Sequence, residues 1–309
     1  MNKKLIIASL LMLLMNKIAI GSEVESFAST GIRQVNWGLL DFSDAVEYDA
    51  NLHTIIDFKA DFVDDYYIGL IADIDSEAND NRKIAVQFGF DDWNFYYDTG
   101  KVTGKFASEP DLDVQPTAGT EFSLGYDMYA FYKGNSIGGT GYGYLEVELP
   151  TEGDVDAYNS VTDTSQSLRV IDPKAKFQLV GYYLFLDPAR EILYANKSDG
   201  WSGEIRMLVG LGNINASREG AKLVEAATSL SIDNPSLLSI GAESSMRLGY
   251  YGGFKNGDGG VSMSYAFGYE LQYLFILPIY EELDQNTVLQ GENTGYMNHG
   301  LFAKLSFSW

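Results

Sequence analysis

The feature that most constrains this chain is a regular alternation of apolar and polar side chains over unusually long runs. In the clearest run, residues 261–275, every second side chain is apolar: Val261, Met263, Tyr265, Phe267, Tyr269, Leu271, Tyr273 and Phe275. Successive side chains of a β-strand point to opposite faces, so this period of two predicts a strand with one apolar face. The run is much longer than the roughly 5 to 6 residues of an ordinary soluble strand.

The same alternation recurs along the chain and predicts which side chains face outward. The predicted outward-facing sets are Leu52, Thr54, Ile56, Phe58, Ala60 and Phe62; Phe122, Leu124, Tyr126, Met128, Ala130 and Tyr132; Ala175, Phe177, Leu179, Gly181 and Tyr183; Trp201, Gly203, Ile205, Met207, Val209 and Leu211; and Leu238, Ile240, Ala242, Ser244, Met246, Leu248 and Tyr250. Short connections such as Asp91-Asp92 alternate with long polar segments at 107–119, 150–173 and 278–298. This arrangement is typical of an antiparallel barrel.

The spacing of these runs predicts fourteen strands. They lie near residues 24–37, 52–62, 66–74, 83–90, 93–107, 120–132, 139–149, 174–186, 189–194, 201–212, 221–232, 237–252, 261–277 and 299–309. The segment 189–194 is short, and 221–232 has a composition that also suits a helix. Without these two the count is twelve, so the sequence predicts an all-β barrel of 12 to 14 strands.

The C-terminal residues alternate in the same way and end on an aromatic side chain. The apolar set of this tail is Leu301, Ala303, Leu305, Phe307 and Trp309, with Lys304, Ser306 and Ser308 on the other face. The tail resembles the closing strand of bacterial outer-membrane β-barrels, and as architecture the resemblance extends over the whole chain after the N-terminal segment. It implies a porin-like transmembrane barrel in the cell outer membrane, with both termini in the periplasm. It also implies that this tail is the signal read by the barrel-assembly machinery.

The N-terminal segment has the pattern of a secretory signal peptide. Lys3 and Lys4 precede an apolar run from Leu5 to Met15, and the small residues Ala19 and Gly21 have the spacing of a signal-peptidase site. The apolar run is shorter than the roughly 20 residues of a membrane-spanning helix. The sequence therefore predicts a cleaved signal peptide at 1–21 and one barrel domain at 22–309.

Composition supports this class and excludes others. The chain of 309 residues has 21 Tyr, 17 Phe and 32 Gly against 7 Pro. Tyrosine and tryptophan form girdles at the membrane interfaces of barrels, and glycine lets strands bend. With no cysteine there is neither a disulfide framework nor a lipoprotein anchor. A net charge of −22 argues against nucleic acid as a partner.

Charged side chains on the inner face predict an aqueous or ion-paired lumen, because unpaired charges are not tolerated in a dry interior. The predicted pore-lining residues are Asp57, Lys59, Asp61, Glu121, Asp127, Lys174, Lys176, Glu204, Arg206, Glu243, Arg247, Glu270 and Lys304. The bases lie mostly on later strands and a group of acids on earlier ones. One hypothesis is therefore a transverse field between opposed charge ladders, and the other is simple pairing of neighbours such as Asp57 with Lys59.

These features predict a channel for passive diffusion of small hydrophilic solutes, with cation selectivity because acidic residues are in excess. The alternative is a non-conducting structural or adhesive barrel, whose lumen would be filled by paired charges and by Tyr129, Phe131 and Tyr182. A barrel hydrolase is a further alternative. Only His53 and His299 are available as a histidine base, and neither lies in a nucleophile motif, so we predict no enzyme.

The sequence predicts no cofactor and no metal site. The acidic segment 73–80 lacks the glycine and closing glutamate of an EF-hand, so it is interpreted as a solvated loop. The expected partners are outer-membrane lipid and lipopolysaccharide, the barrel-assembly machinery acting through the C-terminal strand, and small hydrophilic solutes.

Overall fold

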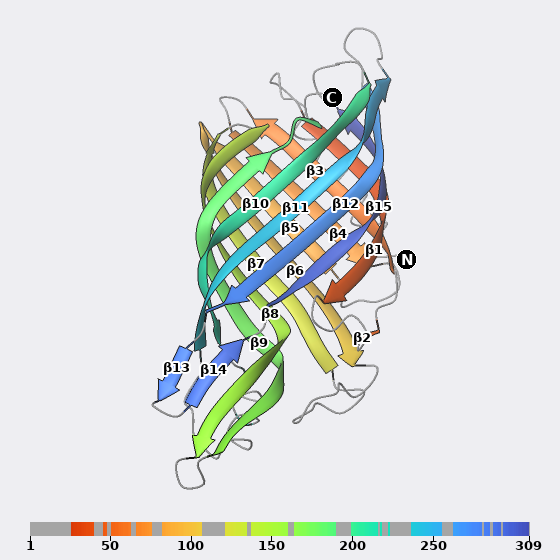
Figure 1. The fold of residues 1–309 in the computed structure, drawn as a ribbon. Coiled ribbons are helices and arrows are strands. Elements are labelled where there is room, and N and C mark those ends of the chain that lie inside the picture. Colours follow the sequence, from red (N-terminus) through yellow and green to blue (C-terminus); the bar gives the residue numbers. More distant parts are fainter. Residues whose placement is uncertain are drawn as a thin grey trace.

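The computed structural model of the protein is a closed all-β barrel of twelve antiparallel strands (Figure 1). It describes residues 26–39, 46–47, 51–62, 66–75, 82–106, 121–134, 137–159, 164–189, 199–215, 217, 222, 236–254, 262–279, 281–284, 287–291 and 293–308. The predicted signal peptide and Trp309 lie outside these residues. Among the described residues, no helix is long and apolar enough to cross a membrane.

The barrel strands follow one another in chain order around the ring. They are β1 (Ser26–Leu39), β3 (Asn51–Phe62), β4 (Tyr66–Asp75), β5 (Arg82–Phe90), β6 (Trp93–Phe106), β7 (Glu121–Gly134), β8 (Gly138–Asn159), β9 (Thr164–Leu186), β10 (Gly200–Asn215), β11 (Ser236–Phe254), β12 (Ser262–Pro278) and β15 (Thr294–Ser308). Pairing of β1 with β15 closes the ring. The all-β barrel is confirmed, and it closes on twelve strands. The two weak predicted strands, near 189–194 and 221–232, lie almost wholly outside the described residues.

The two ends of the barrel differ. At the short-turn end, β1 begins, β15 ends, and the two-residue turn Asp91-Asp92 joins β5 to β6. Asp91 has a φ of 50°, the left-handed conformation that a tight hairpin turn requires and that aspartate tolerates. At the opposite, long-strand end, β8 and β9 project beyond the other strands (Figure 1).

The projecting hairpin differs from the sequence prediction of a loop at 150–173. β8 and β9 have 22 and 23 residues and remain paired as far as Asn159 and Thr164. Their register shifts at Pro150, where the missing backbone N–H interrupts the ladder. The sheet continues from β8 to β14 (Thr287–Gly291) and β13 (Glu281–Asp284), while β2 (Val46–Glu47) pairs with β6.

Strand faces agree with the prediction on most strands and are reversed on two. The predicted outward sets of β3, β10, β11, β12 and β15 lie on the outer wall where their side chains are described. On β7 and β9 the predicted outward sets, from Phe122 to Tyr132 and from Ala175 to Tyr183, point into the barrel instead. A period of two shows that the faces differ but does not say which one is inside. Here the lumen itself holds an apolar core.

Four neighbouring strands place a glycine on the inner wall at one level: Gly143, Gly181, Gly210 and Gly241. A Cβ on Gly210 would lie 2.1 Å from the carbonyl oxygen of Val180, so this close approach of β9 and β10 requires glycine. A Cβ on Gly241 would lie 2.6 Å from the Phe177 ring. The glycine row therefore makes room for the side chains that fill the lumen.

Candidate functional site: the charged lumen

Six side chains inside the barrel form a chain of alternating charge across five strands, which we call the charge chain. It runs from Asp73 on β4 through Arg33 on β1, Glu270 on β12, Arg247 on β11 and Glu204 on β10 to Arg206 on β10. The successive N···O distances are 2.9, 2.8, 2.7, 3.2 and 2.6 Å. Each charge is thus balanced by its neighbours, as a buried ionic network requires.

Glu270 is the centre of the charge chain. One carboxylate oxygen accepts from Arg33 Nη1 at 2.8 Å, and the other accepts from Arg247 Nε and Nη2 at 3.0 and 2.7 Å. Only 2% of the Glu270 side chain is exposed. His53 lies at one end of the chain, with Nδ1 2.7 Å from Asp73 Oδ1. Asp73 is also paired with Arg33, so we interpret the contact between His53 and Asp73 as part of the ionic network of the lumen.

The opposite end of the charge chain reaches across the lumen. The Arg206 guanidinium donates to the hydroxyl of Tyr96 on β6 and lies over the Tyr96 ring, 4.4 Å from its centroid. Tyr96 in turn donates to Asp98, which pairs with Lys83 of β5 at 3.3 Å. Polar side chains therefore connect the β10 wall to the β5–β6 wall through the interior.

Two opposite walls of the barrel touch inside the lumen. Tyr126 on β7 and Tyr296 on β15 are six strands apart in a ring of twelve, and their ring centroids are 6.3 Å apart, nearly stacked. The Tyr126 hydroxyl donates to Asp98, and the Tyr296 hydroxyl accepts from Gln272. These bonds hold both rings where the two walls meet.

An apolar core fills the lumen toward the long-strand end. Phe106, Phe122, Leu149, Ile171 and Ile276 contribute to it from five strands, and each is at most 1% exposed. The core also extends along β6 to β9 toward the short-turn end, where it includes Tyr132, Tyr183 and Phe185. The interior is therefore an ionic network beside an apolar core.

Several buried polar atoms of the interior lack a hydrogen-bond partner in the described part of the chain. They are Ser29 Oγ, Arg33 Nε, His53 Nε2, Arg206 Nε, Glu243 Oε2, Gln272 Oε1 and Asn298 Oδ1. Buried polar atoms normally bind protein or ordered water, so these positions indicate where internal water would sit.

The structure brings together eight of the thirteen residues predicted to line a pore. Asp57, Lys59, Glu204, Arg206, Glu243, Arg247, Glu270 and Lys304 point inward. Asp57 pairs with Lys304 of β15, and Lys59 lies over the Tyr67 ring at 4.4 Å. Pairing therefore occurs between strands, and not between Asp57 and Lys59. The alternation of the charge chain also differs from the predicted separation of bases and acids.

Four predicted pore-lining residues face outward: Glu121, Asp127, Lys174 and Lys176. The error follows from the reversed faces of β7 and β9, since the apolar residues of these strands fill the lumen and leave the charges outside. For the same reason Tyr129, Phe131 and Tyr182 lie on the outer wall. The side chain of Asp61 lies outside the described part of the structure.

Sequence reasoning missed Arg33, Lys83 and Asp98. Arg33 shares a face with Ser29 and Val35, a mixed set that shows no clear alternation. Lys83 shares a face with Ala85 and Gln87, and Asp98 shares one with Tyr96, so in each case the charge sits on a face that is otherwise uncharged or aromatic. The sequence did contain one signal for Lys83. The opposite face of β5, from Ile84 to Phe90, is continuously apolar, which indicates that the face with Lys83 points into the barrel.

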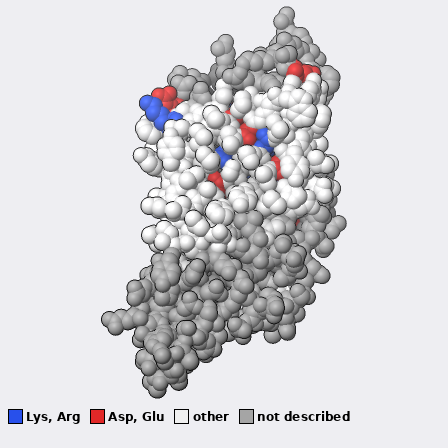
Figure 2. Space-filling view, in the orientation of Figure 1, with Lys and Arg blue, Asp and Glu red and all other residues white. Residues whose placement is uncertain are grey.

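The outer wall is predominantly apolar over its middle. Large exposed apolar side chains recur around the ring, including Ile32, Phe88, Phe131, Leu211 and Leu248. Figure 2 shows one face on which charged atoms lie near the rim, with only a few visible between uncharged side chains in the middle. Monomeric soluble proteins rarely expose a continuous apolar surface of this kind.

The sequence matches no family model, and a search of curated proteins gives no match. Among solved structures, the chain is similar to the P. putida toluene transporter TodX, with 8% identity over 94% of this chain and 91% of that chain, at a TM-score of 0.25. It is also similar to a TodX monoaromatic hydrocarbon channel deltaS2 mutant, with 7% identity over 93% and 90% of the two chains, at a TM-score of 0.23. At such low scores neither similarity supports an argument about function.

Proposed function

We propose that this protein is an integral β-barrel of the bacterial outer membrane that is closed by its own side chains. In this proposal it holds its long-strand end at the cell surface and does not pass solutes freely. The membrane assignment is supported by the apolar outer wall, because twelve paired strands satisfy the backbone polar groups that lipid cannot. The resemblance of the C-terminal strand to outer-membrane barrels supports the same compartment.

The closed state is supported by one observation above all, the contact of Tyr126 with Tyr296 between opposite walls. A barrel of twelve strands has room for a narrow lumen, so its closure depends on which side chains fill it. Here the charge chain, the apolar core and this tyrosine pair occupy the interior. We infer that hydrated ions do not pass in this conformation.

Surface presentation is supported by the projecting strands. β8 and β9 extend far beyond the ring, and β13 and β14 widen this part into a sheet of four strands. If both termini lie in the periplasm, as in the family that the C-terminal strand resembles, this sheet projects outside the cell. An extended sheet whose outer strand β13 pairs only with β14 among the described residues is a suitable surface for contact with other molecules.

The test is the conductance of the refolded mature chain in a planar bilayer, with folding verified by heat-modifiable migration in gels. We expect a folded barrel that produces no stable conductance steps. Regular steps from the unmodified chain would contradict the closed barrel.

The predicted channel for small hydrophilic solutes remains a second candidate. It is favoured by the buried polar atoms of the interior that have no hydrogen-bond partner among the described residues. Water at these sites would make the ionic half of the lumen a path that a movement of Tyr126 and Tyr296 completes. In that case the unmodified chain would conduct, and the double variant Tyr126→Ala/Tyr296→Ala would be open more often. The reversal potential in a potassium chloride gradient would then report any cation selectivity.

A further inference from the structure

Along β6, β7 and β8 the outer wall changes abruptly from aromatic to polar on the way to the long-strand end. Tyr97, Tyr129 and Tyr144 are direct neighbours on β6, β7 and β8, with ring centroids 4.8 and 6.2 Å apart. The next row toward the long-strand end consists of Thr99, Asp127, Glu146 and Gln178. The change therefore occurs within a single step of the strands.

The tyrosines are joined to the polar row by their hydroxyl groups. Tyr97 donates to Asp127 at 2.8 Å, and Tyr144 donates to Glu146 at 2.9 Å. A tyrosine with its ring on an apolar wall and its hydroxyl toward polar groups is typical of a membrane interface. If the barrel spans the membrane as proposed above, the polar rows lie at the level of the lipid headgroups.

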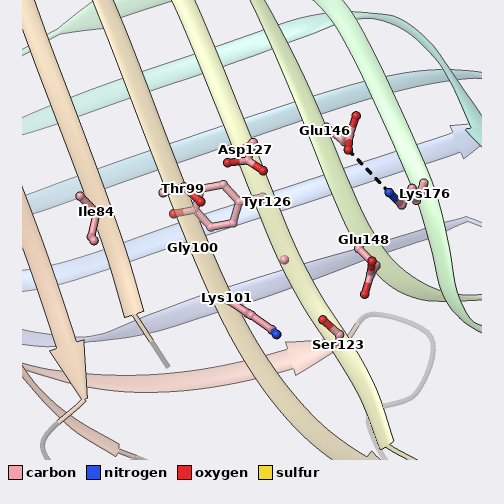
Figure 3. A pocket seen from close by; sticks show the side chains of 11 residues that line it. Ile84, Thr99, Gly100, Lys101, Ser123, Tyr126, Asp127, Glu146, Glu148 and Lys176 are labelled. Carbon is pink, nitrogen blue, oxygen red and sulfur yellow. Dashed lines mark ion pairs between the residues drawn. The ribbon is translucent and has the colours of Figure 1, made fainter. Parts of the chain in front are cut away.

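A pocket of about 510 Å³ opens on the wall at this level (Figure 3). Its floor is Gly125, where an added Cβ would meet only the carbonyl oxygen of Gly100, at 3.8 Å. The charged side chains around it are Lys101, Asp127, Glu146, Glu148 and Lys176. Lys101 and Glu148 are the direct neighbours of Gly125 on β6 and β8, so they face each other across the floor.

The charges of this pocket are only partly balanced by each other. Glu146 accepts from Tyr144 and from Gln178, and its other oxygen is 3.9 Å from Lys176 Nζ. By contrast, Lys101 and Glu148 make no ion pair or hydrogen bond with another described side chain. Two opposite charges thus remain available across a glycine floor.

We propose that this pocket binds the headgroup of a membrane lipid that carries both a phosphate and an ammonium group. Lys101 donates to the phosphate, and Glu148 accepts from the ammonium group. A phosphate without an ammonium group fits less well, because the acidic side chains around the floor repel a second anion. Phosphatidylethanolamine and phosphoethanolamine-bearing lipopolysaccharide share this chemistry.

The proposal is tested by native mass spectrometry of the detergent-purified mature protein titrated with phosphatidylethanolamine, phosphatidylglycerol or lipopolysaccharide with and without phosphoethanolamine. We expect tighter binding of the ammonium-bearing form of each pair. Loss of one charge-assisted contact lowers affinity by about tenfold or more, so Lys101→Met and Glu148→Gln should each weaken binding by that factor. Which ammonium-bearing lipid binds more tightly identifies the source.

The controls are Lys105→Met and Glu121→Gln, made on β6 and β7 at an exposed ion pair of 3.5 Å that does not line the pocket. These controls should leave lipid binding unchanged. Equal binding of phosphatidylethanolamine and phosphatidylglycerol, or equal effects of pocket and control variants, would overturn the proposal. Flotation of the protein with vesicles tests membrane insertion separately, and conductance tests closure of the lumen. A failure of the proposed function can therefore be distinguished from a failure of lipid binding at the pocket.

Discussion

The charge chain makes a quantitative prediction about Glu270. This carboxylate is the anion shared by Arg33 and Arg247, and its side chain is 2% exposed. Glu270→Gln keeps the size of the side chain but removes the charge, so two buried arginines lose the anion between them. Removing one partner of a buried ion pair costs about 3 to 5 kcal/mol. Arg33 keeps Asp73 and Arg247 keeps Glu204, but the buried chain of six balanced charges is left with an excess positive charge.

The measurement is urea unfolding of the refolded barrel in lipid vesicles, followed by tryptophan fluorescence. Glu270→Gln should lower the free energy of unfolding by about 3 kcal/mol or more. The matched control is Glu121→Gln on the outer wall, whose pair with Lys105 has side chains 75% and 64% exposed. Exposed pairs contribute about 0 to 1 kcal/mol, so the control should change little. A loss below about 1 kcal/mol for Glu270→Gln would refute the ionic network as a stabilising element of the lumen.

Two further predictions concern the barrel wall. Gly210→Ala should destabilise the barrel by about 1 to 3 kcal/mol, because its Cβ would clash with the β9 backbone. Gly38→Ala, with nothing within 4 Å of the added Cβ, should have almost no effect in the same unfolding assay, and equal losses would contradict the close approach of the strands. Trp201, 69% exposed on the outer wall, should be quenched by lipids brominated on their acyl chains. Undiminished quenching in Trp201→Phe would show that this side chain does not contact lipid.

Much of the fold could be predicted because a strand with one apolar face requires a local alternation of apolar and polar residues in the sequence. The alternation from Met263 to Phe275 located β12 and its outer face, and the tail from Leu301 to Phe307 located β15 in the same way. Twelve of the expected strands are present as barrel strands. The lengths of β8 and β9 were underestimated most, since their projecting parts carry prolines and acidic residues that favour loops. β15 also begins earlier than predicted, at Thr294, and the short strands β2, β13 and β14 were not predicted.

The candidate site was predicted less completely, because the contents of the lumen depend on distant strands. On β7, the same alternation that places Tyr126 on one face places Asp127 on the other, and sequence alone assigned the charged face to the inside. The structure reverses this assignment because Tyr126 meets Tyr296 inside an apolar core, a contact made across the ring.

The sequence by itself determined that this chain forms many long two-faced strands, since a period of two is a property of neighbouring residues. Only the tertiary structure decided that the ring closes on twelve strands, that β7, β8 and β9 turn apolar faces inward, and that Glu270 joins Arg33 to Arg247. The physical reason is that closure and ion pairing depend on distances between residues far apart in the chain. Local alternation carries no information about those distances.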